Sequence, residues 1–129
     1  MKYLLLIYSN PRNWEHPTFL HQHVPQSPEE RDAQMRAFAA LLTEISESGE
    51  LCEHAPLADP VLTKTVRVRD EVPAATDGPF LEAKEHLAGY FVVDCDSPER
   101  AVELAARFPD ARYGAVEVRP IMTLSGPDL

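Results

Sequence analysis

The chain has 129 residues, of which 44% are hydrophobic and 26% are charged, and this composition is typical of a single soluble globular domain spanning residues 1–129. Its 12 basic and 21 acidic residues give a net charge of −9 without a basic stripe, which disfavours direct binding to nucleic acid. No stretch approaches the roughly 18 apolar residues that cross a bilayer, and the apolar run near the start lacks a signal-peptide cleavage site, so we expect a cytoplasmic protein that does not enter a membrane.

The first half of the chain predicts a buried strand, a long loop and a helix. Residues 2–8, KYLLLIY, are apolar at both alternating positions, which is typical of a strand covered on both faces. Residues 10–26 contain three prolines and three histidines without periodicity, and a loop of this length indicates a functional segment. The run SPEE at 27–30 is a capping box, and the apolar spacing after it predicts a helix over about 28–48 that Gly49 ends.

The second half predicts five more elements. Strands at about 50–57 and 61–69 are expected to form a hairpin, and the second of them alternates valine with arginine as a half-exposed strand should. After a turn at Asp-Gly-Pro, residues 87–94 are again apolar on both faces. A second Ser-Pro-Glu signal predicts a helix within 97–109, and the alternating run 114–121 is a strand whose proline places it toward a sheet edge.

This order of elements predicts an α+β fold of the ferredoxin-like split βαβ plan, with an antiparallel sheet and an elaborated hairpin. Two helices can cover only one face of such a sheet. Because the strands at 2–8 and 87–94 are apolar on both faces, the uncovered face is expected to pack against a second copy. We therefore predict a homodimer joined sheet on sheet through the open face, which closes a shared barrel.

Four segments of the sequence resemble the DGPF-domain branch of the YCII-related family: KYLLLIY, LTKTVRVRD, TDGPFLEAKEHLAGYFVVD and GAVEVRPI. The resemblance implies a dimeric α+β barrel of ferredoxin-like subunits. It also implies small-molecule enzymology that uses a His/Asp pair in a pocket beneath the barrel, and a frequent occurrence of the branch beside extracytoplasmic-function sigma factors. This sequence departs from the branch at His86, where a glutamine is usual, and at Ala88, where the branch has glycine.

The turn around Asp-Gly-Pro-Phe gathers candidate catalytic side chains. Asp77, Lys84 and His86 provide a carboxylate, an ammonium and an imidazole. The carboxylate could orient the histidine that moves a proton, and the ammonium could hold an anionic intermediate. The alternative is structural, because Asp77 can accept backbone hydrogen bonds in a turn that Gly78 and Pro79 form. In that alternative, the charged residues that follow are a solvated cluster.

Four further residues are candidate ligand-binding groups. Tyr8 ends the first strand, and Phe80 and Glu82 belong to the turn that would form the rim of a pocket. Arg67 could bind a carboxylate through two parallel hydrogen bonds, and its alternative role is a cross-strand ion pair.

The loop histidines form an H-x4-H-x-H pattern. His21 and His23 would lie on one side of an extended segment, with His16 as a third nitrogen ligand for zinc or another divalent ion. The loop offers no cysteine and no carboxylate beyond Glu15, so we predict no metal site and keep these histidines as an open alternative. The sequence also lacks a glycine-rich phosphate loop, a nucleophile elbow and a dinucleotide fingerprint, so no cofactor is predicted.

The sequence thus predicts a cofactor-independent enzyme or binder of small molecules, with proton transfer or elimination carried by Asp77 and a histidine. The alternative is a non-enzymatic interaction or regulatory module, which the resemblance links to a sigma-factor unit and in which the turn is scaffold. The sequence leaves open whether the chain is an enzyme, and it names no substrate.

Overall fold

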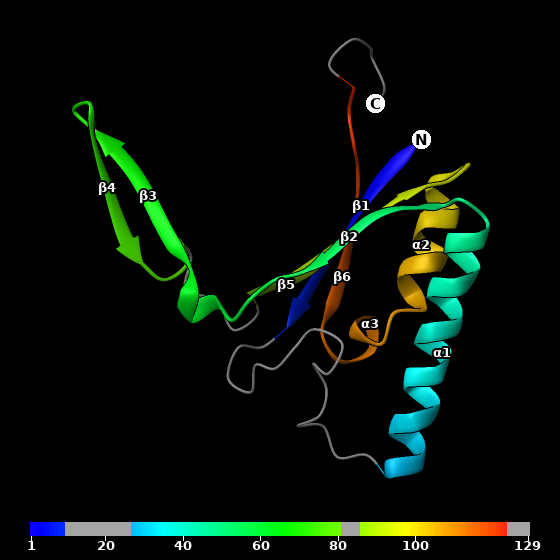
Figure 1. The fold of residues 1–129 in the computed structure, drawn as a ribbon. Coiled ribbons are helices and arrows are strands. Elements are labelled where there is room, and N and C mark those ends of the chain that lie inside the picture. Colours follow the sequence, from blue (N-terminus) through cyan, green and yellow to red (C-terminus); the bar gives the residue numbers. More distant parts are fainter. Residues whose placement is uncertain (10–26, 81–85, 124–129) are drawn as a thin grey trace.

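The computed structural model describes residues 1–9, 27–80 and 86–123 of the chain (Figure 1). Along the chain, these residues form β1 (Lys2–Ser9), α1 (Pro28–Glu47), β2 (Leu51–Pro56), the 3-10 helix η3 (Pro60–Leu62), β3 (Lys64–Arg69), β4 (Val72–Asp77), β5 (His86–Asp94), α2 (Pro98–Ala106), α3 (Asp110–Tyr113) and β6 (Ala115–Pro120). No helix within these ranges is long and apolar enough to cross a membrane.

The main sheet has four strands in the order β2-β5-β1-β6, and each neighbouring pair is antiparallel. The α-helices lie on one face of this sheet (Figure 1). This arrangement confirms the α+β, ferredoxin-like fold. As predicted, the proline-containing strand β6 lies at an edge of the sheet.

The predicted hairpin between 50–57 and 61–69 is wrong. Strand β2 pairs with β5, whereas β3 pairs with β4 in a separate two-stranded sheet. The cause lies at Asp59 and Pro60, because the Asp59 carboxylate accepts a hydrogen bond from Val61 N at 2.9 Å and begins a turn of 3-10 helix. This turn interrupts the strand and sends the chain away from the main sheet.

The helices begin where the capping signals predict. Ser27 Oγ accepts a hydrogen bond from Glu30 N at 3.1 Å, and Ser97 Oγ accepts one from Arg100 N at the same distance. The short helix α3 was not predicted, because Pro109 indicates a helix end. In the structure, Pro109 instead precedes one more helical turn.

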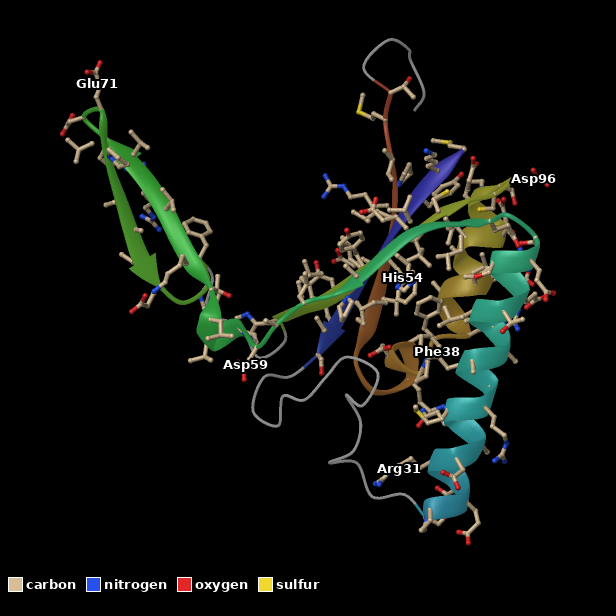
Figure 2. All side chains as sticks on the ribbon, viewed as in Figure 1. Arg31, Phe38, His54, Asp59, Glu71 and Asp96 are labelled. Carbon is tan, nitrogen blue, oxygen red and sulfur yellow. The ribbon has the colours of Figure 1, made fainter. Side chains whose placement is uncertain are left out.

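The core lies between the helices and one face of the sheet. Phe108 is 2% exposed and makes edge-to-face contacts with Phe38 and Phe91, at ring-centroid distances of 5.5 and 4.7 Å. Figure 2 shows Phe38 on α1 pointing toward the sheet. The fully buried side chains around these rings come from β1, β5, α1 and α2: Tyr3, Leu5, Leu41, Ile45, Val93 and Leu104.

The opposite face of the main sheet, here called the open face, carries a second set of apolar side chains. Leu4 pairs with Val92 and Leu6 pairs with Tyr90 in the register of β1 and β5, and all four are only half-buried. None of the α-helices in the described part of the chain lies on this side (Figure 1). The sheet is therefore apolar on both faces, as the sequence predicts, with one face left uncovered.

Strands β3 and β4 form an arm, defined as Lys64–Asp77, that projects away from the helices (Figure 1). Asp70 and Glu71 join the strands with φ values of 52° and 65°, the conformation of a type I′ turn. Figure 2 shows Glu71 at the tip of the arm and Asp59 at its base. All residues of β4 are exposed, so the arm adds nothing to the core.

The start of β6 approaches β1 closely at Gly114. A Cβ atom at this position would lie 2.6 Å from the carbonyl oxygen of Tyr8, which is backbone and cannot move aside cheaply. We expect Gly114→Ala to lower the free energy of unfolding by about 1 to 3 kcal/mol. Urea unfolding checks this, and an unchanged midpoint would contradict the close approach.

Candidate functional site

The Asp-Gly-Pro turn fixes the base of the arm. Asp77 pairs with Lys64 across the two strands, in agreement with the register of β3 and β4. Gly78, at a φ of 92°, donates its N–H to the Thr63 carbonyl at 2.7 Å and accepts a hydrogen bond from Thr65 Oγ at 2.6 Å. The glycine is needed because residues that carry a side chain rarely adopt this φ value. These contacts set where the following residue, Pro79, lies.

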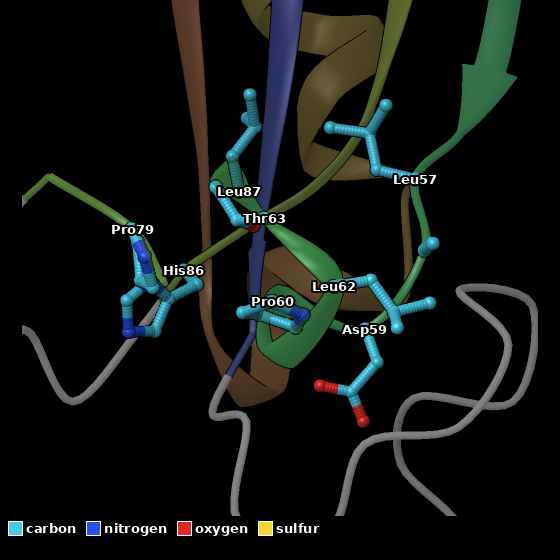
Figure 3. Close-up of a pocket in the computed structure, with 9 residues that line it drawn as sticks. Leu57, Asp59, Pro60, Leu62, Thr63, Pro79, His86 and Leu87 are labelled. Atoms are coloured by element: carbon cyan, nitrogen blue, oxygen red, sulfur yellow. The ribbon is translucent and has the colours of Figure 1, made fainter. Parts of the chain in front are cut away.

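A pocket of about 380 Å³ opens beside this base (Figure 3). Three segments form its walls: the chain after β2, the turn that leads into the arm, and the residues around the start of β5. The lining residues are Leu57, Ala58, Asp59, Pro60, Leu62, Thr63, Pro79, His86 and Leu87. The walls are thus largely aliphatic with a few polar groups, as in sites that bind small organic molecules.

The two ionisable groups of the pocket lie on different walls. His86 is the half-buried first residue of β5 and lies beside Pro79, whereas Asp59 lies beyond Pro60 on the other side (Figure 3). One oxygen of Asp59 accepts the hydrogen bond from Val61 N that begins η3. The two side chains therefore flank the pocket and do not form an Asp/His pair with each other.

The structure separates the predicted catalytic residues. Among the described residues, His86 lines the pocket and Asp77 does not, since Asp77 pairs with Lys64 on the arm. Lys84 lies outside the described residues, and so does the ligand-binding candidate Glu82.

The predicted ligand-binding residues Arg67 and Phe80 meet each other. The Arg67 guanidinium carbon lies 4.8 Å from the centroid of the Phe80 ring, a cation–π contact. Phe80 is 66% exposed, so this contact lies at the surface. Neither residue lines the pocket described above.

Tyr8 lies on the open face next to the pocket, because it pairs in register with Leu87. Its hydroxyl donates a hydrogen bond to Glu117 at 3.2 Å, and burial together with this bond raises the pKa of Tyr8. Tyr90 donates in the same way to Glu53 at 2.9 Å, and that bond raises the pKa of Tyr90. Two neutral tyrosines bonded to carboxylates therefore flank the apolar centre of the open face.

Sequence reasoning missed Asp59 and the residues of η3, which it assigned partly to a strand. The pair Asp59-Pro60 is a helix-start signal of the same kind as those recognised at 27 and 97, and it could have identified the turn. The meeting of this turn with the start of β5 depends on contacts between distant segments, and no local pattern encodes it.

The histidine pattern His16, His21 and His23 lies outside the described residues. Within the described ranges, no cluster of three or more histidine, cysteine, aspartate or glutamate side chains could hold a metal ion.

Two comparisons with known proteins show the family to which the chain belongs. The family model of the YCII-related domain matches residues 1–125. An uncharacterized protein of Rhizobium meliloti (strain 1021) is 34% identical over 97 residues, which cover 74% of this chain and 78% of that protein. The chain belongs to the YCII-related domain family.

Proposed function

We propose that the pocket at the base of the arm binds a small organic molecule and that His86 moves a proton to or from it. The observation that carries this proposal is an imidazole in the wall of an otherwise largely aliphatic pocket of about 380 Å³. An imidazole can accept and return a proton near neutral pH, and apolar walls limit competition from water. The reaction class is proton transfer or elimination without a cofactor.

Asp59 would assist binding from the opposite wall. One of its oxygens is held by Val61 N, which fixes the carboxylate in place. The other oxygen would accept a hydrogen bond from a hydroxyl or amine of the bound compound. Such a compound would place its acidic C–H or O–H toward His86 and a polar substituent toward Asp59.

Binding is tested by a thermal-shift panel of small metabolites, with one variant that fills the pocket. A compound at 100 times its Kd should raise the Tm by about 4 °C or more. Ala58→Trp should remove this shift, because Ala58 lines the pocket and is itself exposed. Ala40→Trp, at an exposed site on α1, is the matched control and should keep the shift. A shift that survives Ala58→Trp would place the ligand elsewhere.

The proton-transfer role is tested with the compound that the panel identifies. His86→Gln keeps a polar side chain of similar reach but cannot serve as a general base, so turnover should fall by about a hundredfold or more while binding changes little. Equal turnover in wild type and His86→Gln would contradict the role. Asp77→Asn tests the predicted catalytic role of Asp77. If the variant changes stability but neither ligand binding nor turnover, Asp77 is a structural residue of the arm.

We also propose that the open face joins two copies in a homodimer. The half-buried apolar centre of this face supports the proposal, since an exposed patch of this kind marks an interaction site. Two sheets packed face to face would form the shared barrel.

The alternative function is a non-enzymatic interaction or regulatory module. The exposed arm supports this alternative, because a projecting two-stranded sheet can bind another protein without a pocket. It predicts that no compound in the panel shifts the Tm and that a partner protein co-purifies with the chain.

A further inference from the structure

The arm has two chemically different sides. Residues opposite each other in an antiparallel pair point to the same side, so Val66 and Ala75 share a side with Val68 and Pro73. Val66 and Val68 are 63% and 56% exposed, which leaves this apolar side open to solvent. The other side carries Arg67 and Arg69 together with Ala74 and Val72.

An arm of this kind is not expected to be stable alone. Strands β3 and β4 pack chiefly against each other, and an isolated two-stranded hairpin is marginally stable in water. The turn at Asp70 and Glu71 adds a cost, because neither residue is a glycine and both have positive φ values. A surface that covers the apolar side would supply the missing stabilisation.

The position and length of the arm favour a second copy of this chain as that surface. The arm projects on the side of the main sheet away from the helices, which is the side of the open face (Figure 1). Its six-residue strands are about 20 Å long, enough to reach along a copy seated on that face.

We propose that each arm clasps the other subunit of the homodimer, with the apolar side of Val66, Val68, Pro73 and Ala75 lying against it. This inference rests on the sheet-to-sheet dimer proposed above. It has a consequence for the pocket, because Leu62, Thr63 and Pro79 at the base of the arm form part of its walls. A clasped arm would hold these walls in one position, so that dimerisation completes the binding site.

Sedimentation velocity tests the clasp with substitutions on the two sides of the arm. The double variant Val66→Lys with Val68→Lys should weaken dimerisation at least about a hundredfold. In each subunit it replaces two valine side chains that the clasp would bury with charged ones. Val72→Lys is the matched control on the arginine side, where it adds a charge next to Arg69, and it should leave dimerisation within a few fold. All three substitutions reduce the net negative charge, so general repulsion cannot explain a weaker dimer.

Hydrogen exchange provides a second readout in the unmodified chain. The paired amides of β3 and β4 should exchange more slowly as the protein concentration rises through the dimerisation range. Exchange that does not depend on concentration, or a dimer insensitive to the double variant, would overturn the clasp and leave the sheet-to-sheet dimer standing. A wild-type chain that stays monomeric would overturn both the clasp and the sheet-to-sheet dimer. The thermal-shift panel would still test ligand binding at the pocket separately.

Discussion

Leu6→Glu is expected to convert the proposed homodimer into a folded monomer. Leu6 lies at the centre of the open face, between Tyr90 on β5 and Glu117 on β6. In the proposed dimer, the substitution buries an unpaired carboxylate in each subunit, which costs several kcal/mol per ion. The dissociation constant should therefore rise by at least about a thousandfold. Sedimentation velocity measures the change.

The matched control is Val102→Glu, which adds the same charge on α2. Val102 is 57% exposed and belongs to a helix on the covered face of the sheet, so this variant should remain a dimer. Circular dichroism should show native secondary structure for both variants, because Leu6 does not belong to the buried core. A Leu6→Glu protein that remains dimeric would show that the open face is not the interface.

The second large effect is expected at Glu50, which joins the end of α1 to α2. Arg100 donates two hydrogen bonds to its carboxylate, from Nε at 2.9 Å and from Nη2 at 3.0 Å. The side chains of Glu50 and Arg100 are only 16% and 27% exposed, so solvent screens the pair weakly. The Arg100 hydrogen bonds lower the pKa of Glu50 to about 2, from an ordinary value of 4.5.

Because the folded-state pKa is depressed, the stabilisation is complete above about pH 4.5 and is lost as the pH falls toward 2. Glu50→Gln should lower the free energy of unfolding at pH 7 by on the order of 3 kcal/mol. The difference between wild type and variant should shrink between pH 5 and pH 2. Urea unfolding at fixed protein concentration measures the free energy of unfolding of both proteins at each pH. A difference that stays constant between pH 5 and pH 2 would contradict the role of the Glu50–Arg100 pair.

Much of the fold follows from local signals in the sequence. Ser27 and Ser97 identify the starts of the long helices because each caps a backbone N–H that would otherwise lack a partner. The apolar residues on both faces of β1 and β5 identify the central strands of the sheet. The pairing of β3 could not be predicted in this way, because its valine and arginine alternation fits a strand in either sheet.

The candidate site was only partly predictable. His86 was identified because it follows the Asp-Gly-Pro-Phe turn, and the structure places it in the wall of the pocket. Asp77 was grouped with it by proximity along the chain, whereas in space Asp77 belongs to the exposed arm. Asp59 lies far from His86 in sequence, and the two share a pocket only because β2 and β5 are neighbours in the sheet.

The most direct test of the pocket is the NMR signal of the His86 imidazole during titration with a compound from the thermal-shift panel. His54 provides an internal reference, because it does not line the pocket. Its ring stacks on that of Phe91, with the two ring centroids 5.2 Å apart. We expect the His86 signal to shift and saturate with the bound fraction while the His54 signal stays in place. Saturating binding that leaves the His86 signal unmoved would contradict binding in the pocket beside His86.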